Sequence, residues 1–281
     1  MNLPALSKWF RRSQDATTII NDTSFLTQET AKVYHACLTD CLTSRHLTEF
    51  RRDAYLYHKK SVCPEPDDAP IKVEIGDALR VLALEGPELF KARYATGGPV
   101  DAAGKPCGRY SSEFEKWAAS QDKPVISHEQ MRLVDTLHDS VRGHRLASEL
   151  LSCGVAGGVV RTIYRGLACQ GRIEWLNPRA GLVSLQTTGD LSWFDCEAKV
   201  SGHVHNMAFL RALVLQVTGQ VLPTFLIAVE DRWPHRCGVW AVAKGVLGAA
   251  QRENEQAMER LAECRRLNRW PTGFEDLRAV K

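Results

Sequence analysis

The chain has 281 residues, which is enough for one large domain or two small ones with a buried core. Its 44% hydrophobic and 25% charged residues are ordinary for a globular protein. No apolar run approaches the roughly 20 residues of a transmembrane helix, and the first fifteen residues lack the apolar segment of a signal peptide. The net charge of +3 permits nucleic-acid binding without requiring it. We expect a cytoplasmic protein with no membrane partner.

The nine cysteines are odd in number and have no regular spacing. Cys37 and Cys41 are four residues apart, but no tight group of cysteines suggests an iron–sulfur cluster. Reduced, mostly buried thiols of a cytosolic protein are the better interpretation.

The amino-terminal part of the chain is predicted to be helical. Residues 1–30 show no clear period and are expected to form a partly ordered leader, and residues 31–281 to form a single domain with a helical front section at 31–70. A helix at 31–42 is followed by one that Thr43 or Ser44 caps. One side of this second helix is basic, and its candidate nucleic-acid contacts are Arg45, His46, Arg51, Arg52, Lys59 and Lys60. A solvated helix face is the alternative.

The middle of the chain alternates helices with glycine- and proline-rich breaks. Loops are predicted at 62–70 and 94–110, and helices at 75–90, 111–120 and 128–151. Residues 154–158 are expected to form a glycine-rich break, and because no GK[ST] follows, they are not a P-loop.

The remainder of the chain is predicted to supply a sheet. Strands are expected at 159–164, 168–175, 182–187, 222–229 and 238–243, with helices at 194–217 and 244–268. The near-continuous apolar run 222–229 is typical of a strand buried on both faces. This order predicts an α/β fold with a mixed central sheet flanked by helices.

The stretch 171–194 carries the candidate chemistry as a strand, a turn and a second strand. Ser184 and Gln186 are two residues apart, so they lie on the same face of the second strand. Glu174 on the first strand is the one acid near them and is at best a weak metal ligand, since Mg²⁺ needs several hard oxygen ligands. The alternative is a structural carboxylate paired with Arg172 or Arg179.

The histidines of the next helix do not form a convincing metal pair. His203 and His205 are two residues apart, so they do not face each other on a helix. We expect them, with Asn206, to be polar residues near the start of the helix.

Several segments over most of the chain resemble the PDDEXK-like, RecE-type exodeoxyribonuclease family of phage and bacterial recombination systems. They include YHACLTDCLTSRHLTEFRRDAYLYHKK, GDALRVLALEGPELF, CQGRIEWLNPRAGLVSLQTTGDLSWF and FLIAVEDRWPHRCGVW. The resemblance implies a restriction-endonuclease-like (PDDEXK) core, with the amino-terminal helices helping to hold DNA.

The resemblance also implies an altered catalytic site. Arg80 stands where active relatives have a histidine, Gly157 where they have a glutamate, and Ser184 and Gln186 where they have a D-x-K pair. Glu174 is the one acid kept. His203 and Asn206 fall in the helix that supports the site, as does Leu210.

We therefore predict a nuclease-fold protein of DNA recombination or processing whose catalysis is lost or reduced. Its partners would be double-stranded DNA ends, a recombination protein or further copies of itself. One alternative is an active, Mg²⁺-dependent exonuclease with relocated ligands such as Asp190, Asp195 or Glu230. The other is an interaction protein without DNA contact.

Overall fold

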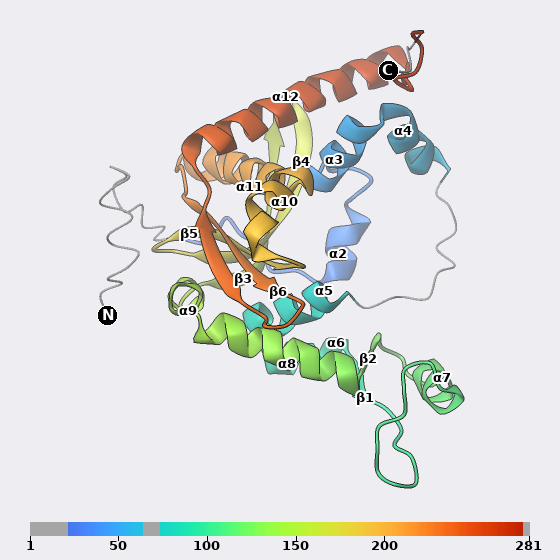
Figure 1. Cartoon of the computed structure of the whole chain (residues 1–281). Coiled ribbons are helices and arrows are strands. Elements are labelled where there is room, and N and C mark those ends of the chain that lie inside the picture. The colour runs from blue at the N-terminus through green and yellow to red at the C-terminus, as the bar shows by residue number, and fades with distance from the viewer. Residues whose placement is uncertain (1–21, 64–73, 278–281) are drawn as a thin grey trace.

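In the computed structural model, which describes residues 22–63 and 74–277, five strands form a central sheet between two layers of helices (Figure 1). The sheet order is β3-β4-β5-β6-β7, in which β5 and β6 are parallel and all other neighbours are antiparallel. The strands are β3 (Val155–Tyr164), β4 (Leu167–Asn177), β5 (Gly181–Thr188), β6 (Thr224–Glu230) and β7 (Cys237–Ala241). The predicted mixed sheet flanked by helices is confirmed.

Strand β6, which lies between β5 and β7, is buried at every position, as its apolar sequence predicts. Side chains of β6 alternate between two clusters, with Leu226 in one and Ile227 in the other. The first cluster lies under α3 (Ser44–Arg52), α11 (His203–Thr218) and α12 (Lys244–Leu267), and the second under α5 (Ile75–Arg80), α8 (His128–Gly143) and α9 (Arg145–Leu151). The two layers lie on opposite faces of the sheet (Figure 1).

Helix α11 packs very closely on β4. A Cβ atom at Gly171 would lie 2.4 Å from Leu210 Cδ2, so any other residue there would have to displace this leucine side chain. This close approach places the middle of α11 against β4, and both elements contribute to the cavity described below.

The front section contains α2 (Ala31–Ala36), α3 and α4 (Ala54–Val62). The side chain of Thr43 caps α3 by accepting a hydrogen bond from the His46 N–H. The side chain of Asp53 caps α4 in the same way through Leu56 N–H, which divides the predicted second helix into two. The predicted helix at 31–42 ends at Ala36, and most of the loop predicted at 62–70 falls outside the described residues.

Part of the predicted leader 1–30 is described, and it packs on the sheet edge. Thr27 pairs with Val159 of β3, Leu26 is buried, and Glu29 accepts hydrogen bonds of 2.6 and 2.8 Å from the Arg161 guanidinium. Residues 1–21 fall outside the described part of the chain.

Several predicted elements differ from the observed ones. One predicted break is part of a strand, and two predicted helices are each divided in two. The glycine-rich break predicted at 154–158 is wrong, since β3 begins at Val155 and includes both Gly157 and Gly158. The helix predicted at 194–217 is two helices, α10 (Phe194–Val200) and α11, separated at Gly202, whose φ is 82°. The helix predicted at 128–151 is likewise divided into α8 and α9 at His144, which caps α9.

The helix predicted at 75–90 has the most irregular course. After α5 the chain forms a π-helical turn, η1 (Val81–Glu85), passes through Gly86, and restarts as α6 (Pro87–Arg93). The predicted loop 94–110 contains β1 (Ala95–Gly97), which pairs with β2 (Val125–Ser127) in a small parallel sheet beside α7 (Ser112–Ala119). A 3₁₀ turn, η2 (Leu191–Trp193), joins β5 to α10.

Candidate functional site

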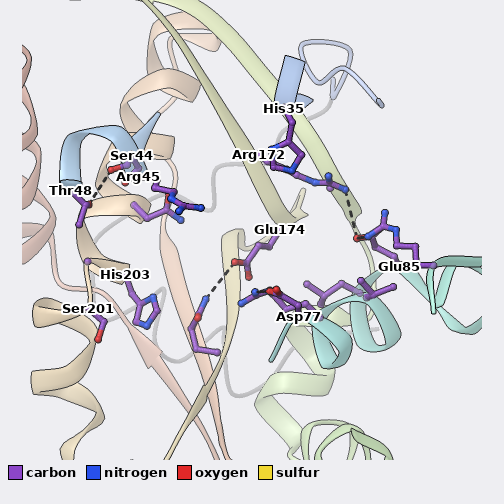
Figure 2. A pocket seen from close by; sticks show the side chains of 18 of the residues that line it. His35, Ser44, Arg45, Thr48, Asp77, Glu85, Arg172, Glu174, Ser201 and His203 are labelled. Atoms are coloured by element: carbon purple, nitrogen blue, oxygen red, sulfur yellow. Dashed lines mark hydrogen bonds and ion pairs between the residues drawn. The ribbon is translucent and has the colours of Figure 1, made fainter. Parts of the chain in front are cut away.

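A cavity of about 790 Å³ opens between the front helices, α5 with η1, the sheet and the start of α11. It brings together residues that are far apart in the sequence. Those predicted from the sequence that line it are Arg45, Arg80, Gly157, Glu174, Gln186, His203 and Asn206. Ser184 is buried directly beside it. In the view of Figure 2, Glu174 points into the cavity between His203 on one side and Asp77 and Glu85 on the other.

The position of Glu174 follows from the way β4 and β5 separate. Their antiparallel register joins Asn177 to Gly181 and extends only to the pair of Trp175 and Val183. Beyond this point β5 keeps its pairing with β6, and the Leu185 N–H donates to the Glu174 carboxylate at 2.8 Å. The carboxylate thus occupies the gap where the two strands part.

The remaining contacts of Glu174 are also to uncharged donors. Ser184 Oγ donates to Glu174 Oε2 at 3.0 Å, and Gln186 Nε2 lies 3.4 Å from Oε1. Gln186 Nε2 also donates to Ser184 Oγ at 2.6 Å, which links the two residues of β5. Glu174 is therefore held by one backbone and two side-chain groups that carry no charge.

Arg172 lies two residues before Glu174 on β4 and also lines the cavity. It forms an ion pair with Glu85 of η1 in which Arg172 Nη2 lies 3.7 Å from Glu85 Oε1 (Figure 2). Glu85 in addition accepts hydrogen bonds from both terminal nitrogens of Arg93 on α6, one of them at 2.9 Å. The sequence-based alternative that Arg172 or Arg179 pairs with Glu174 is therefore wrong: Glu85 takes the Arg172 guanidinium, and in the described part of the chain neither arginine forms an ion pair with Glu174.

Arg80 and Gly157 line the cavity from two different elements, α5 and β3. Arg80 forms an ion pair with Asp77, one turn earlier on α5. On the paired strands β3 and β4, Gly157 lies opposite Glu174. The neighbouring pairs are Ala156 with Trp175 and Gly158 with Ile173. The φ angle of Gly157 is 65°. A Cβ atom there would lie 2.9 Å from Arg172 Nη2.

The start of α11 supplies the polar wall at the other end. His203 is half-buried, and burial lowers the pKa of its imidazole. The negative charge of Glu197 raises this pKa, whereas the positive charge of Arg80 lowers it further. Asn206 lines the cavity one turn later. His205 faces away and contacts Glu253 of α12 at 2.7 Å, so the two histidines do not converge.

The acids considered as relocated ligands lie elsewhere. Glu230 at the end of β6 binds Arg236 and the Leu191 N–H, and Asp190 caps η2 through the Ser192 N–H. Neither they nor Asp195 line the cavity. The acids that do line it with Glu174 are Glu49, Asp77 and Glu85, and each of these is paired with an arginine.

The candidate nucleic-acid contacts of the front helices fall into two groups. Arg51 is half-buried and bonds Asn254 of α12 and Thr48, and His46 is half-buried beside the Tyr57 ring. These two side chains join helices together. The exposed group consists of Arg45, at the cavity rim and paired with Glu49, together with Arg52, Lys59 and Lys60.

Sequence reasoning missed Asp77, Glu85, Arg93 and His35, all of which line the cavity. Asp77 and Glu85 are eight residues apart and reach it because the π-helical turn η1 changes the helix phase between them. An uninterrupted helix was predicted there, so no signal in the sequence pointed to these residues.

The donor set does not fit a divalent metal ion. Mg²⁺ requires several oxygen ligands that converge on one point, whereas the oxygens of Glu174 already accept hydrogen bonds from neighbouring donors. The Gln186 amide nitrogen directed at them is a donor and cannot bind a cation. Within residues 22–63 and 74–277, no group of three or more His, Cys, Asp or Glu side chains could hold a metal ion.

With the sheet, the diverging strands and the cavity established, the chain can be compared with known proteins. Residues 58–281 match a family described as a PDDEXK-like domain of unknown function (DUF3799). The match covers most of the chain, and the chain belongs to this family of PDDEXK-like domains. No curated protein matches it.

A solved structure has the same fold. The crystal structure of a putative exonuclease from Eubacterium rectale superposes with a TM-score of 0.64 and covers 91% of this chain and 95% of its own. The two sequences are 13% identical, so the likeness concerns the fold. The predicted PDDEXK-like core is confirmed, whereas the assignment to the RecE type stays a prediction. In the described part of the chain, no helix is both long and apolar enough to cross a lipid bilayer.

Proposed function

We propose that this protein is a nuclease-fold DNA-binding protein of DNA recombination or processing that has little or no catalytic activity. The observation that carries the proposal is the environment of Glu174, whose carboxylate is held by Leu185 N–H, Ser184 and Gln186. Metal-assisted phosphodiester hydrolysis needs carboxylates that are open to a cation and a cationic group near the scissile phosphate. Here three neutral donors contact the carboxylate.

DNA binding is supported by the cations around the cavity. Arg45 stands at its rim with its side chain 86% exposed, and Arg52, Lys59 and Lys60 extend the positive charge along the front helices. Cations near DNA release condensed counterions, which makes binding favourable and dependent on salt. A DNA partner and nine free cysteines agree with a protein that acts in the cytoplasm.

The experiment is incubation of the purified full chain with linear duplex DNA and Mg²⁺ or Mn²⁺. We expect DNA to be bound but not degraded, even when protein and DNA are equimolar. Digestion that disappears in Glu174→Ala would overturn the proposal and establish an active exonuclease. If DNA is neither bound nor cut, the protein is an interaction protein without DNA contact.

A further inference from the structure

A basic surface lies outside the cavity, where α4 meets the carboxyl-terminal end of α12. We define the α4–α12 basic surface by Lys59, Lys60, Arg265 and Arg269, all of which are exposed. The two halves are about two hundred residues apart in the sequence, and Figure 1 shows α4 beside this end of α12.

Aromatic stacking fixes the two halves together. The ring of His58 on α4 stacks on Trp270, just after α12, with centroids 4.2 Å apart and planes inclined by 2°. Tyr57 also contacts Trp270, with the ring centroids 6.4 Å apart. Because Lys59 follows His58 and Arg269 precedes Trp270, the stack holds cations of both elements near one another.

The cations of this surface are not neutralised within the described part of the chain. The ion pairs of the described residues include none of its four cations, Lys59, Lys60, Arg265 and Arg269. The nearby Glu263 forms an ion pair with Arg266 at 2.6 Å. Asp53 uses its carboxylate to cap α4. The positive charge is therefore available to a partner.

The surface is also continuous with the rim of the cavity. Burial lowers the pKa of His46; the negative charge of Glu49, which pairs with Arg45, opposes this, and the positive charges of Arg45 and Arg265 act with burial, so both guanidinium groups lie near this imidazole. Arg45 itself lines the cavity. The cations thus extend from the cavity rim across α3 to the end of α12.

We propose that the α4–α12 basic surface binds the phosphate backbone of duplex DNA that continues from the cavity. This inference rests on the proposed DNA-binding function and specifies its main contact surface. Lysine and arginine side chains suit this role, since phosphate contacts fix a protein on the duplex without reading its sequence. The Trp270–His58 stack serves as the support that keeps the cations in place.

The test is the salt dependence of the affinity of the full chain for a blunt-ended linear duplex, measured by fluorescence anisotropy between about 50 and 200 mM salt. Each phosphate contact contributes about 0.9 to the slope of log affinity against log salt. We expect Arg265→Ala with Arg269→Ala to reduce the slope by nearly 2, and Lys59→Ala with Lys60→Ala to do the same from the other element. Arg265→Lys with Arg269→Lys should keep the wild-type slope.

The matched control is Arg132→Ala with Arg145→Ala, which removes two exposed arginines from α8 and α9 on the opposite face. Its slope should equal that of the wild type. A wild-type slope in both the α12 and the α4 variants would overturn this inference and leave the proposed function in place. A wild-type protein with no salt-dependent DNA binding would instead reject the proposed function.

Sedimentation of the free proteins adds a second readout. We expect the wild type and the α12 variant to have the same mass in solution. If the variant loses a wild-type oligomer while its DNA slope is unchanged, the surface is an interface between protein chains, and the inference is wrong.

Discussion

Arg172 Nη2 lies 3.7 Å from the Glu85 carboxylate, and this contact leaves Glu174, on the same strand and two residues away, to neutral donors. Glu174 thus has no ion pair with Arg172, because the Arg172 guanidinium faces a competing carboxylate. The consequence is a site in which Glu174 has become part of the hydrogen-bonding structure of the sheet. Its contribution to stability should then exceed that of an ordinary surface glutamate.

Replacement of Glu174 by alanine tests this directly. Glu174→Ala leaves the Leu185 N–H and the Ser184 hydroxyl without their acceptor in a partly buried place, and we expect a loss of about 2 kcal/mol in the free energy of unfolding. Glu174→Gln keeps one acceptor oxygen and should cost less. Urea unfolding measures both, and Glu115→Ala on exposed α7 is the control. Equal effects at positions 174 and 115 would contradict the structural role.

The geometry between β4 and β5 also predicts how metal binding could be restored. In Ser184→Asp with Gln186→Lys, a second carboxylate would stand beside Glu174, where Ser184 Oγ is now 3.0 Å away. Glu174 and the new aspartate carry two adjacent negative charges and the new lysine only one positive charge, so we expect the variant to be less stable than the wild type without metal. Mg²⁺ or Mn²⁺ should reverse this loss, by about 2.7 kcal/mol at a hundred times the dissociation constant.

Thermal unfolding across a metal titration measures the effect. The control is Ser184→Asn with Gln186→Lys, which has nearly the same shape but lacks the added negative charge. The same metal response in the control and in the Asp variant would show that the ion binds elsewhere.

The site could be predicted in part because a strand alternates its side chains with a period of two residues. This rule places Ser184 and Gln186 on one face, and the family resemblance adds Glu174, Arg80 and Gly157. The structure brings all of these to the cavity or its wall. The mixed sheet followed from the order of the predicted helices and strands, and the burial of β6 on both faces followed from its apolar run.

The partners of these residues could not be predicted, since they depend on irregular geometry. Arg172 was the nearest cation to Glu174 in the sequence, yet the π-helical turn of η1 presents Glu85 to it. The separation of β4 from β5 leaves the Leu185 N–H free to donate to Glu174. The periodicity of hydrophobic residues in the sequence does not indicate where two paired strands separate. Long-range contacts of this kind decide the charge of the site.

Gly157 should be intolerant of any side chain for two separable reasons. Its φ of 65° disfavours other residues, and a Cβ atom would lie 2.9 Å from Arg172 Nη2. Gly219 at the end of α11 has a φ of 70° but open space around the same position. We expect Gly219→Ala to cost about 1 kcal/mol from the backbone alone and Gly157→Ala about 1 kcal/mol more.

A double-mutant cycle separates the two contributions. In an Arg172→Ala background the added contact is absent, so the cost of Gly157→Ala should fall to that of Gly219→Ala. A cost that does not change in this background would mean that the guanidinium does not occupy the space beside Gly157.

The acid stability of the protein should depend on Glu230 at the end of β6. Its side chain is 4% exposed, and hydrogen bonds from the Arg236 guanidinium, which include one of 2.8 Å from Nε, lower the pKa of the carboxyl to about 2. The ordinary value of 4.5 applies to the unfolded chain. Since the folded value is the lower one, the stabilisation is complete above pH 4.5 and is lost as the pH falls from 4.5 to about 2.

Arg236→Ala removes the cause of this shift while the carboxylate stays buried. We expect the variant to be less stable than the wild type at pH 7, with a difference that shrinks as the pH falls towards 2 and vanishes only below about pH 2, where Glu230 is protonated in both proteins. Glu230→Gln, which has no titrating group at this position, should lose stability less steeply than the wild type over the same interval. Urea unfolding at a series of pH values provides the comparison. A difference between the wild type and Arg236→Ala that stays constant from pH 7 to pH 2 would mean that the guanidinium stabilises the loop between β6 and β7 by packing and not through the charge of Glu230.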